Sequence, residues 1–367
     1  MNDMRSNARD AALLAAEWVR PEIRKATAYR VPPSAGLIKL DAMENPYAVP
    51  PAVKARLMQA LDRVPLNRYP DAGADSVKLA LRRALAIPDA FDVLPGNGSD
   101  ELIQVITCAL AQPGAVMLAP DPSFVMYRAN AMLHSMRFVA VPLRPDFDLD
   151  VPAMLDAIER ERPALVFLAY PNNPTGNVFS AESIEAVIRA TPGLVVIDEA
   201  YQAFARTSFL PRLEDFPNAV VLRTLSKLGM AAMRLGYVVG DAAWLAEFNK
   251  VRAPYNVNAL TQAATDALLS DATWLEEQAA AIIGERSRLA AELQRLPGVT
   301  CFPTQTNFLL VRLPSSNAVF DALLERRILV KNLHGWHALL DNMLRITVGT
   351  PEENGALLTA MQEICAR

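Results

Sequence analysis

Cysteine and histidine are the scarcest residue types in this sequence, with three of each among 367 residues. Cys108, Cys301 and Cys365 are far apart and form no Cys-x-x-Cys pair. They predict buried apolar thiols in a reducing cytoplasm and not a disulfide framework. His334 and His337 lie close together, but no cysteine or carboxylate cluster accompanies them, which argues against a metal site.

The chain also lacks a basic excess and any long apolar run. A net charge of −4 offers no field for nucleic acid or an anionic membrane, so any phosphate on a ligand must be held by a local site. No stretch of about 18 apolar residues is present to span a membrane. Residues 1–10 are polar, without the apolar core of a signal peptide, so we expect a cytoplasmic protein.

Length and composition indicate a globular protein of more than one domain. A chain of 367 residues exceeds what one hydrophobic core usually supports, and 52% apolar against 21% charged residues excludes a disordered chain. We expect an N-terminal segment, residues 1–45, that joins the small domain. A large domain, residues 46–255, and a small C-terminal domain, residues 256–367, should follow.

Short runs rich in Val, Ile and Leu alternate with helical stretches in the middle of the chain. Continuous apolar runs are typical of strands buried on both faces, and the alternation predicts an α/β fold with a mainly parallel sheet between helices. Such sheets bind ligands at the carboxyl ends of their strands. The expected strands are residues 115–119, 137–143, 164–170, 194–198, 219–224 and 235–239.

The pattern changes after about residue 254. One long helical segment and then shorter strands predict a smaller α+β domain. The expected elements there are a helix over residues 259–296, strands at 308–312, 329–331 and 344–348, and a final helix at 352–366. Earlier helices are expected at residues 10–20, 51–64 and 76–85.

Two ionisable residues directly follow expected strands. Lys227 comes after the strand at 219–224, where a desolvated amine would be a nucleophile, unless it simply reaches the surface in a loop. Asp198 ends the strand at 194–198 and Tyr201 follows it. The carboxylate of Asp198 could bind a metal, accept a proton or hold a protonated ring nitrogen, or it could cap the next helix.

Two turns in the sequence could contact a ligand. The Gly-Asn-Gly-Ser-Asp-Glu of residues 96–101 opens a helix, whose N-terminus suits a phosphate, although an ordinary helix cap would look the same. Asn172 and Asn173 lie between two prolines. Either asparagine could donate a hydrogen bond to a ligand, or the stretch could be turn chemistry alone.

Two arginines complete the set of candidate residues. Arg234 follows Lys227 by seven positions, and its planar fork would suit a phosphate if it were not a surface arginine. Arg345 lies inside an apolar, strand-like stretch and needs an anionic partner, either a substrate carboxylate or a distant acid.

In this order, the motifs resemble the fold-type I aminotransferases, which use pyridoxal 5′-phosphate (PLP), and most closely the histidinol-phosphate aminotransferases. The resemblance extends from about Asp41 to Thr350. Its most specific parts are Asn-Arg-Tyr-Pro at residues 67–70, Arg-Thr-Leu-Ser-Lys at 223–227 and Leu-Arg-Ile-Thr-Val-Gly-Thr at 344–350.

The resemblance implies a role for each residue at the cofactor. Lys227 would carry PLP as a Schiff base and move the proton between the substrate Cα and C4′, and Asp198 would pair with the pyridine nitrogen. Tyr201 and Asn173 would contact the phenolic oxygen, and Phe124 would lie against the ring. At the phosphate, the resemblance implies the backbone of Ser99 and Asp100, the side chains of Ser226 and Arg234, and Tyr69 from the other subunit of a homodimer.

The implied reaction is transamination of L-histidinol phosphate with 2-oxoglutarate to imidazole acetol phosphate and glutamate, a step of histidine biosynthesis. Arg345 would bind the substrate anion, with Tyr29, Asn173 and Lys331 as further substrate contacts. An aromatic amino acid aminotransferase or a threonine-phosphate decarboxylase would keep the same cofactor residues. A catalytically silent regulator would carry a DNA-binding domain, for which the first 45 residues are too short and not basic enough.

Two positions depart from the family pattern. Met43 stands where these enzymes often have asparagine, which puts polar contacts at the mouth of the site in doubt. Many aminotransferases place the phosphate arginine eight residues after the lysine, so the gap of seven here predicts a tighter loop at residues 228–233.

Overall fold

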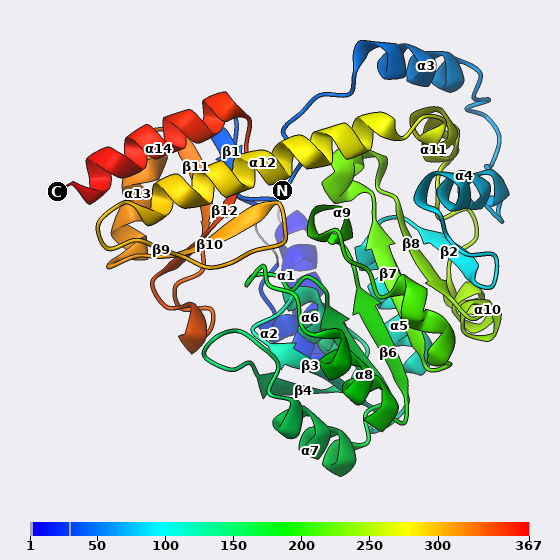
Figure 1. The fold of residues 1–367 in the computed structure, drawn as a ribbon. Helices are drawn as coiled ribbons and strands as arrows, with labels where there is room; N and C mark the ends of the chain where they lie inside the picture. Colours follow the sequence, from blue (N-terminus) through cyan, green and yellow to red (C-terminus); the bar gives the residue numbers. More distant parts are fainter. Residues whose placement is uncertain (1–2, 29–30, 367) are drawn as a thin grey trace.

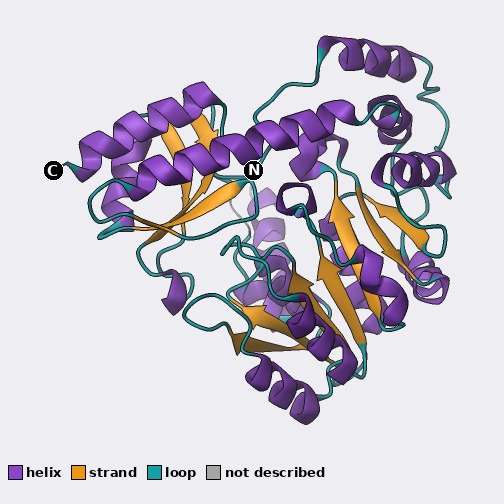
Figure 2. Ribbon diagram, viewed as in Figure 1, coloured by secondary structure: helices purple, strands orange, loops and turns teal. Residues whose placement is uncertain are grey.

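The computed structural model describes residues 3–28 and 31–366. In this part of the chain, seven strands form a larger sheet and five form a smaller one (Figures 1 and 2). The larger sheet has the strand order β2-β8-β7-β6-β5-β3-β4. Its strands are β2 (Asp92–Gly96), β3 (Val116–Asp121), β4 (Arg137–Pro142), β5 (Leu165–Ala169), β6 (Leu194–Asp198), β7 (Ala219–Thr224) and β8 (Gly236–Gly240).

Alternate residues of the central strands enter two separate cores. In β6, Val195 and Ile197 join the core under α7 (Val151–Glu161) and α8 (Ala181–Ala190). Leu194 and Val196 join the opposite core, under α5 (Ser99–Leu110), α6 (Val125–Leu133) and α10 (Ala242–Val251). Because both faces are covered, successive positions such as Leu194 to Ile197 all bury apolar side chains, each worth about 1.5–3 kcal/mol. This explains the continuous apolar runs and confirms the predicted sheet between helices.

Strand direction follows from the length of the connections. Strands β3 to β7 pair in parallel, as predicted, but β8 is antiparallel to both β7 and β2. Residues 225–235 between β7 and β8 are too few for the crossover that a parallel pair requires. Strand β2 was not predicted because Pro95 and Gly96 resemble a turn; a proline is tolerated there because β2 is an edge strand.

The smaller sheet contains a strand from the N-terminal part of the chain. Its order is β1-β11-β12-β10-β9, and β1 pairs in parallel with β11 while the other pairs are antiparallel. The domain boundaries at residues 45 and 255 remain a prediction. The strands are β1 (Ile38–Leu40), β9 (Thr300–Cys301), β10 (Phe308–Arg312), β11 (Ile328–Asn332) and β12 (Met343–Thr347).

Helix α12 (Thr273–Gln294), yellow in Figure 1, runs from the larger domain across the smaller one. The predicted single helix over residues 259–296 is wrong. The chain breaks after α11 (Ala259–Leu269), where the Asp271 carboxylate accepts the Thr273 N–H at 3.2 Å and so helps to begin a new helix. The remaining helices are α1 (Asp3–Trp18), α2 (Pro21–Lys25), α3 (Pro51–Asp62), α4 (Asp75–Leu85), α9 (Gln202–Ala205), α13 (Ser316–Glu325) and α14 (Pro351–Cys365).

Two further observations concern the scarce residues and the membrane. The predicted burial of the cysteines is wrong: Cys108 is exposed on the solvent side of α5, and Cys301 and Cys365 are only partly buried, all three as free thiols. Among the described residues, no helix is long and apolar enough to cross a membrane.

A buried ion pair joins the ends of β6 and β7. Glu199 and Arg223 are 2% and 7% exposed, and Arg223 Nε donates to a Glu199 carboxylate oxygen at 2.9 Å. The Ser208 hydroxyl donates to the same carboxylate at 3.0 Å and accepts from Arg223 Nη2 at 2.8 Å. The pair therefore fixes the backbone beside Asp198.

Removing one partner of this pair should be costly. Arg223→Ala leaves the Glu199 charge buried without its cation, and we expect the free energy of unfolding to fall by about 3–5 kcal/mol. Urea denaturation followed by circular dichroism measures the loss. The control Arg212→Ala removes an exposed ion pair with Glu185 and should cost less than about 1 kcal/mol. Equal losses for the two variants would contradict the structural role of the buried pair.

Candidate active site

One cavity opens at the carboxyl ends of the central parallel strands. Side chains from the ends of β6 and β7, from the start of α5 and from the turn after β5 meet there. The predicted cofactor residues that line it are Ser99, Asp100, Phe124, Asn173, Asp198, Tyr201, Ser226, Lys227 and Arg234. The structure thus brings together all but Tyr69 of the residues predicted for the cofactor.

Asp198 is the buried acid of this cavity, with 5% of its surface exposed. Burial raises its pKa from 3.8 to about 6. Two hydrogen bonds act in the opposite direction: the Tyr127 hydroxyl donates to Oδ2 at 2.7 Å, and the Ala200 N–H donates to Oδ1 at 3.1 Å. Both bonds favour the carboxylate form, which is the form that can pair with a cationic ring nitrogen.

Lys227 extends from the turn after β7 into the same cavity. Its Nζ donates to the Ala42 carbonyl at 3.1 Å. The pKa of its amine is lowered from 10.5 to about 8, mainly by burial and next by the charge of Arg345. About a tenth of the amine is therefore unprotonated at pH 7, far more than for an ordinary lysine, and the unprotonated amine is the nucleophile towards a carbonyl carbon.

The start of α5 forms an anion cradle at one end of the cavity. The first N–H groups of a helix have no partner within the helix, and Ser99 and Asp100, the first residues of α5, line this end. Arg234 lies beside them, with Nη1 at 3.4 Å from the Ser226 hydroxyl. Gly98 has φ 86°, a conformation that favours glycine, and a Cβ there would lie 2.7 Å from Arg234 Nη2 and displace the guanidinium.

The loop between Lys227 and Arg234 consists of short helical turns. It folds into two successive helical turns, Ser226–Met230 and Ala231–Met233, and includes Gly229 at φ 113°. Arg234 itself has φ 49°, a left-handed conformation that directs it back towards α5.

The two asparagines between the prolines, Asn172 and Asn173, make different contacts. Asn172 is fully buried and bonds to the Pro122 carbonyl and to Thr175, so it shapes the turn. The Asn173 side chain faces the cavity, and its Oδ1 accepts from Arg345 Nη1 at 2.7 Å. This bond occupies the amide oxygen and leaves the Asn173 amide nitrogen as the group that can donate.

A neighbouring cavity adjoins the first on the small-domain side and shares Met43, Phe124 and Asn173 with it. Arg345 on β12 and Lys331 on β11 line this second cavity and lie directly opposite each other across the two strands. Burial, followed by the charge of Arg345, lowers the pKa of Lys331. Two adjacent cations of this kind form an electrostatic site for an anion.

Met43 is fixed at the edge of the site by hydrogen bonds of its backbone. Its N–H donates to the Thr347 hydroxyl at 3.0 Å and its carbonyl accepts from Asn307 at 2.9 Å, with φ at 54°. The side chain, only 8% exposed, forms an apolar wall where a family asparagine would be polar.

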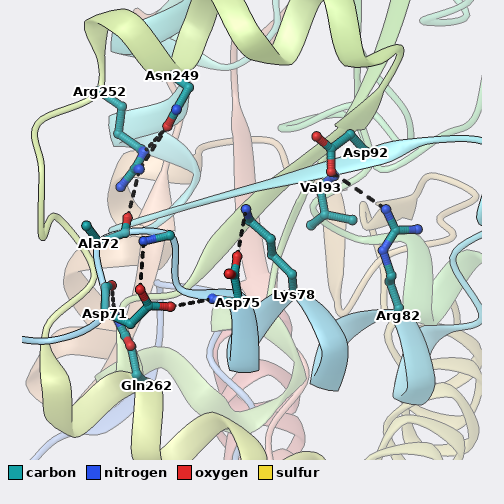
Figure 3. A network of polar contacts seen from close by, with 11 residues as sticks. Asp71, Ala72, Asp75, Lys78, Arg82, Asp92, Val93, Asn249, Arg252 and Gln262 are labelled. Atoms are coloured by element: carbon teal, nitrogen blue, oxygen red, sulfur yellow. Dashed lines mark hydrogen bonds and ion pairs between the residues drawn. The ribbon is translucent and has the colours of Figure 1, made fainter.

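Two predicted residues are not among those that line the cavity in the part of the chain that the structure describes, for different reasons. Tyr29 lies outside the described residues. Tyr69 is 81% exposed and stacks on Tyr255 with ring centroids 4.6 Å apart. The chain just after Tyr69 is fixed by hydrogen bonds from Gln262 to the Asp71 carbonyl and from Arg252 to the Ala72 carbonyl, at 2.8 and 2.9 Å (Figure 3).

Sequence reasoning missed Tyr127, which holds Asp198. Tyr127 is 1% exposed and stacks on Phe167 with centroids 4.5 Å apart. Its position three residues after Phe124 was the available signal, because such residues share a helix face. Among the described residues, no group of three or more His, Cys, Asp or Glu could hold a metal.

The raised pKa of Asp198 predicts a pH-dependent stability. A carboxyl with a higher pKa in the folded protein binds its proton more tightly there, so its stabilising contribution falls as the pH rises from 3.8 to about 6. Asp198→Asn stays neutral. The ligand-free variant should therefore be more stable than the ligand-free wild type near pH 8, by on the order of 1–3 kcal/mol.

Urea denaturation of both ligand-free proteins between about pH 5 and about pH 8 measures this difference. The advantage of Asp198→Asn should shrink as the pH is lowered. Asp89→Asn, at a fully exposed position, is the control and should show no such trend. An advantage that is independent of pH would contradict the assignment to Asp198.

Comparison with known proteins assigns the family. The family model of class I and II aminotransferases matches residues 35–361. Histidinol-phosphate aminotransferases from Nitrosococcus oceani and Chromobacterium violaceum are 51% and 53% identical to this chain. The matches cover 95% and 94% of this chain and 97% of each relative. The crystal structure of histidinol-phosphate aminotransferase from Sinorhizobium meliloti in complex with pyridoxal-5′-phosphate is similar at a TM-score of 0.85 and 28% identity, covering 95% of this chain and 98% of that one. This chain belongs to the class I and II aminotransferases.

Proposed function

We propose that this protein is a cytoplasmic, PLP-dependent histidinol-phosphate aminotransferase of histidine biosynthesis. It transfers the amino group of L-histidinol phosphate to 2-oxoglutarate and yields imidazole acetol phosphate and glutamate. One observation carries the proposal: a single cavity joins the Lys227 amine, the buried Asp198 carboxylate and the anion cradle of α5. The relatives at 51% and 53% identity, named for this substrate, support the choice of amino donor.

The residues present fit PLP. The cofactor phosphate would be held by the N–H groups of Ser99 and Asp100, the Ser226 hydroxyl and Arg234, a cradle that a side chain at position 98 would fill. Asp198 would hold the ring nitrogen at the opposite end of the cavity. Phe124 would cover one ring face, with Tyr201 and Asn173 as donors to the phenolic oxygen.

PLP, when bound, supplies an electrophilic carbon and an electron sink for charge that develops at the substrate Cα. The Lys227 amine, with its pKa near 8, binds the cofactor and then takes the proton from the substrate Cα. The Asp198 carboxylate keeps the proton on the ring nitrogen, and its bonds from Tyr127 and Ala200 stabilise this ionised form.

The second cavity explains how two different amino donors share one site. The Arg345 guanidinium is held in position by hydrogen bonds that it donates to the Asn173 side-chain oxygen and to the Asp41 carbonyl, at 2.7 and 2.9 Å. A guanidinium fork fits a carboxylate or a phosphate, whereas lysine offers a point charge. Arg345 therefore binds the glutamate carboxylate in one half-reaction and, with Lys331, the phosphate of histidinol phosphate in the other.

The function is tested by single-turnover spectroscopy of the two half-reactions. Histidinol phosphate and glutamate should each convert the bound cofactor, and both should act faster than phenylalanine or threonine phosphate. Borohydride should trap PLP on the wild type and on the surface control Lys250→Ala, but not on Lys227→Ala. Faster conversion by phenylalanine would favour the aromatic alternative, and trapping on Lys227→Ala would remove Lys227 from its role.

We propose a homodimer because Tyr69 is exposed although its surroundings are ordered. Tyr69 and the nearby Leu66 are 81% and 82% exposed, and Tyr255 is 41% exposed. Apolar and aromatic groups gathered on one surface are typical of a protein interface. The network of Figure 3 holds this segment, so that Tyr69 can reach the cofactor phosphate of a second copy.

Hybrid dimers test this arrangement. Tyr69→Ala and Lys227→Ala dimers should each be strongly impaired. When mixed, dissociated and reassociated, they should regain about a quarter of the wild-type sites, because half of the dimers are hybrids with one intact site. Lys227→Ala mixed with itself is the control and should stay inactive. A fully active monomer by sedimentation would contradict the proposal.

A further inference from the structure

The cavity beside the PLP cavity has three polar side chains that none of the roles above uses, Asp121, Ser123 and His337, and of these only the histidine can be a neutral donor from a ring N–H. His337 lines it together with Arg345 and Lys331. His337 belongs to the loop between β11 and β12, directly before the helical turn Ala338–Leu340. It therefore approaches the two cations from a different segment of the backbone than either strand.

The hydrogen bond of His337 defines its tautomer. Its Nδ1 lies 3.1 Å from the backbone nitrogen of Leu339. A backbone N–H can only donate, so Nδ1 accepts and carries no proton. The proton of the ring is then on Nε2, and Nε2–H is the donor that the ring can present to the cavity.

The neighbouring tryptophan relates this loop to the cation pair. The Lys331 ammonium lies over the Trp336 ring, 4.7 Å from its centroid. Such a contact orients a lysine without neutralising it. The loop therefore contributes to the cavity through two side chains. Trp336 orients Lys331, and His337 offers its Nε2–H.

We infer that His337 is a specificity-determining residue that donates Nε2–H to the phosphate of the phosphorylated amino donor. The inference rests on the proposed function. A carboxylate has two oxygens, which one arginine fork can fill, whereas the three terminal oxygens of a phosphate monoester can each accept more than one hydrogen bond and so have room for a donor beyond Arg345 and Lys331. A neutral imidazole supplies that donor without adding a third positive charge to Lys331 and Arg345. His337 therefore favours phosphate over carboxylate.

Two variants separate this role from helix capping. Asn at this position retains an acceptor where Nδ1 lies but has no distal donor, so His337→Asn keeps the bond from Leu339 and loses the phosphate contact. His337→Gln places an amide N–H near the position of Nε2 and loses the cap. A purely structural histidine would be rescued by His337→Asn, and a phosphate donor by His337→Gln.

Single-turnover kinetics of the holoenzymes measure apparent affinity for histidinol phosphate and for glutamate. His337→Asn should weaken the affinity for histidinol phosphate about 10- to 100-fold and leave glutamate within about twofold. His337→Gln should recover most of the loss. The inference would be overturned if the wild type is active and His337→Asn binds histidinol phosphate with unchanged affinity. It would also be overturned if His337→Asn loses affinity equally for histidinol phosphate and for glutamate. A wild type inert towards histidinol phosphate would instead overturn the proposed function and the inference with it.

Nuclear magnetic resonance of protein labelled with ¹⁵N-histidine gives a readout independent of turnover. Only three histidines are present, and the His337 signal is assigned by its loss in His337→Asn. We expect the ring proton on Nε2 and a shift on addition of histidinol phosphate. His334, whose Nδ1 accepts from the Asn342 N–H, is exposed and serves as the internal control. A proton on Nδ1, or a His337 signal unmoved by histidinol phosphate, would contradict the inference.

Discussion

Burial shifts the pKa values of two ionisable groups at the carboxyl ends of adjacent strands, and the chemistry of the site depends on those shifts. Asp198 is pushed towards its neutral form and Lys227 towards its unprotonated form, both by desolvation. Tyr127 and Ala200 counter the effect at Asp198, and the charges of Asp100 and Glu44 counter only part of the lowering of the Lys227 pKa. The result is an acid that remains able to hold a proton on a ring nitrogen beside an amine that can attack a carbonyl carbon.

The two-sided core supplies the rigidity that these shifts require. Because alternate residues of β6 enter separate cores, the end of the strand cannot move towards solvent without exposing both. The Glu199–Arg223 pair fixes the turn that follows. The smaller sheet then brings Arg345 and Lys331 to the other side of the cavity, and an apolar cluster that includes Met43, Phe308 and residues of α12 packs where the two sheets meet.

Sequence patterns predicted the parts of the fold that depend on periodicity and connection order. The apolar runs located the central strands, and the order of motifs located the residues that line the cavity. The residue pattern alone left Asn172 and Asn173 open and only the resemblance chose Asn173, because the three-dimensional turn decides which amide faces the cavity. Tyr127 was missed because its partner is 71 residues away in sequence. The contribution of Tyr69 remains a prediction, since it requires a second chain.

The titration of Lys227 in the ligand-free protein tests the account most directly. Carbon-13 labelling of the lysine side chains, with the Lys227 signal assigned by its absence in Lys227→Ala, allows its amine to be titrated by nuclear magnetic resonance. The account predicts a midpoint at about pH 8. A midpoint at the ordinary value of 10.5 would show that the amine is solvated, and would contradict the claim that burial at the end of β7 makes Lys227 the nucleophile.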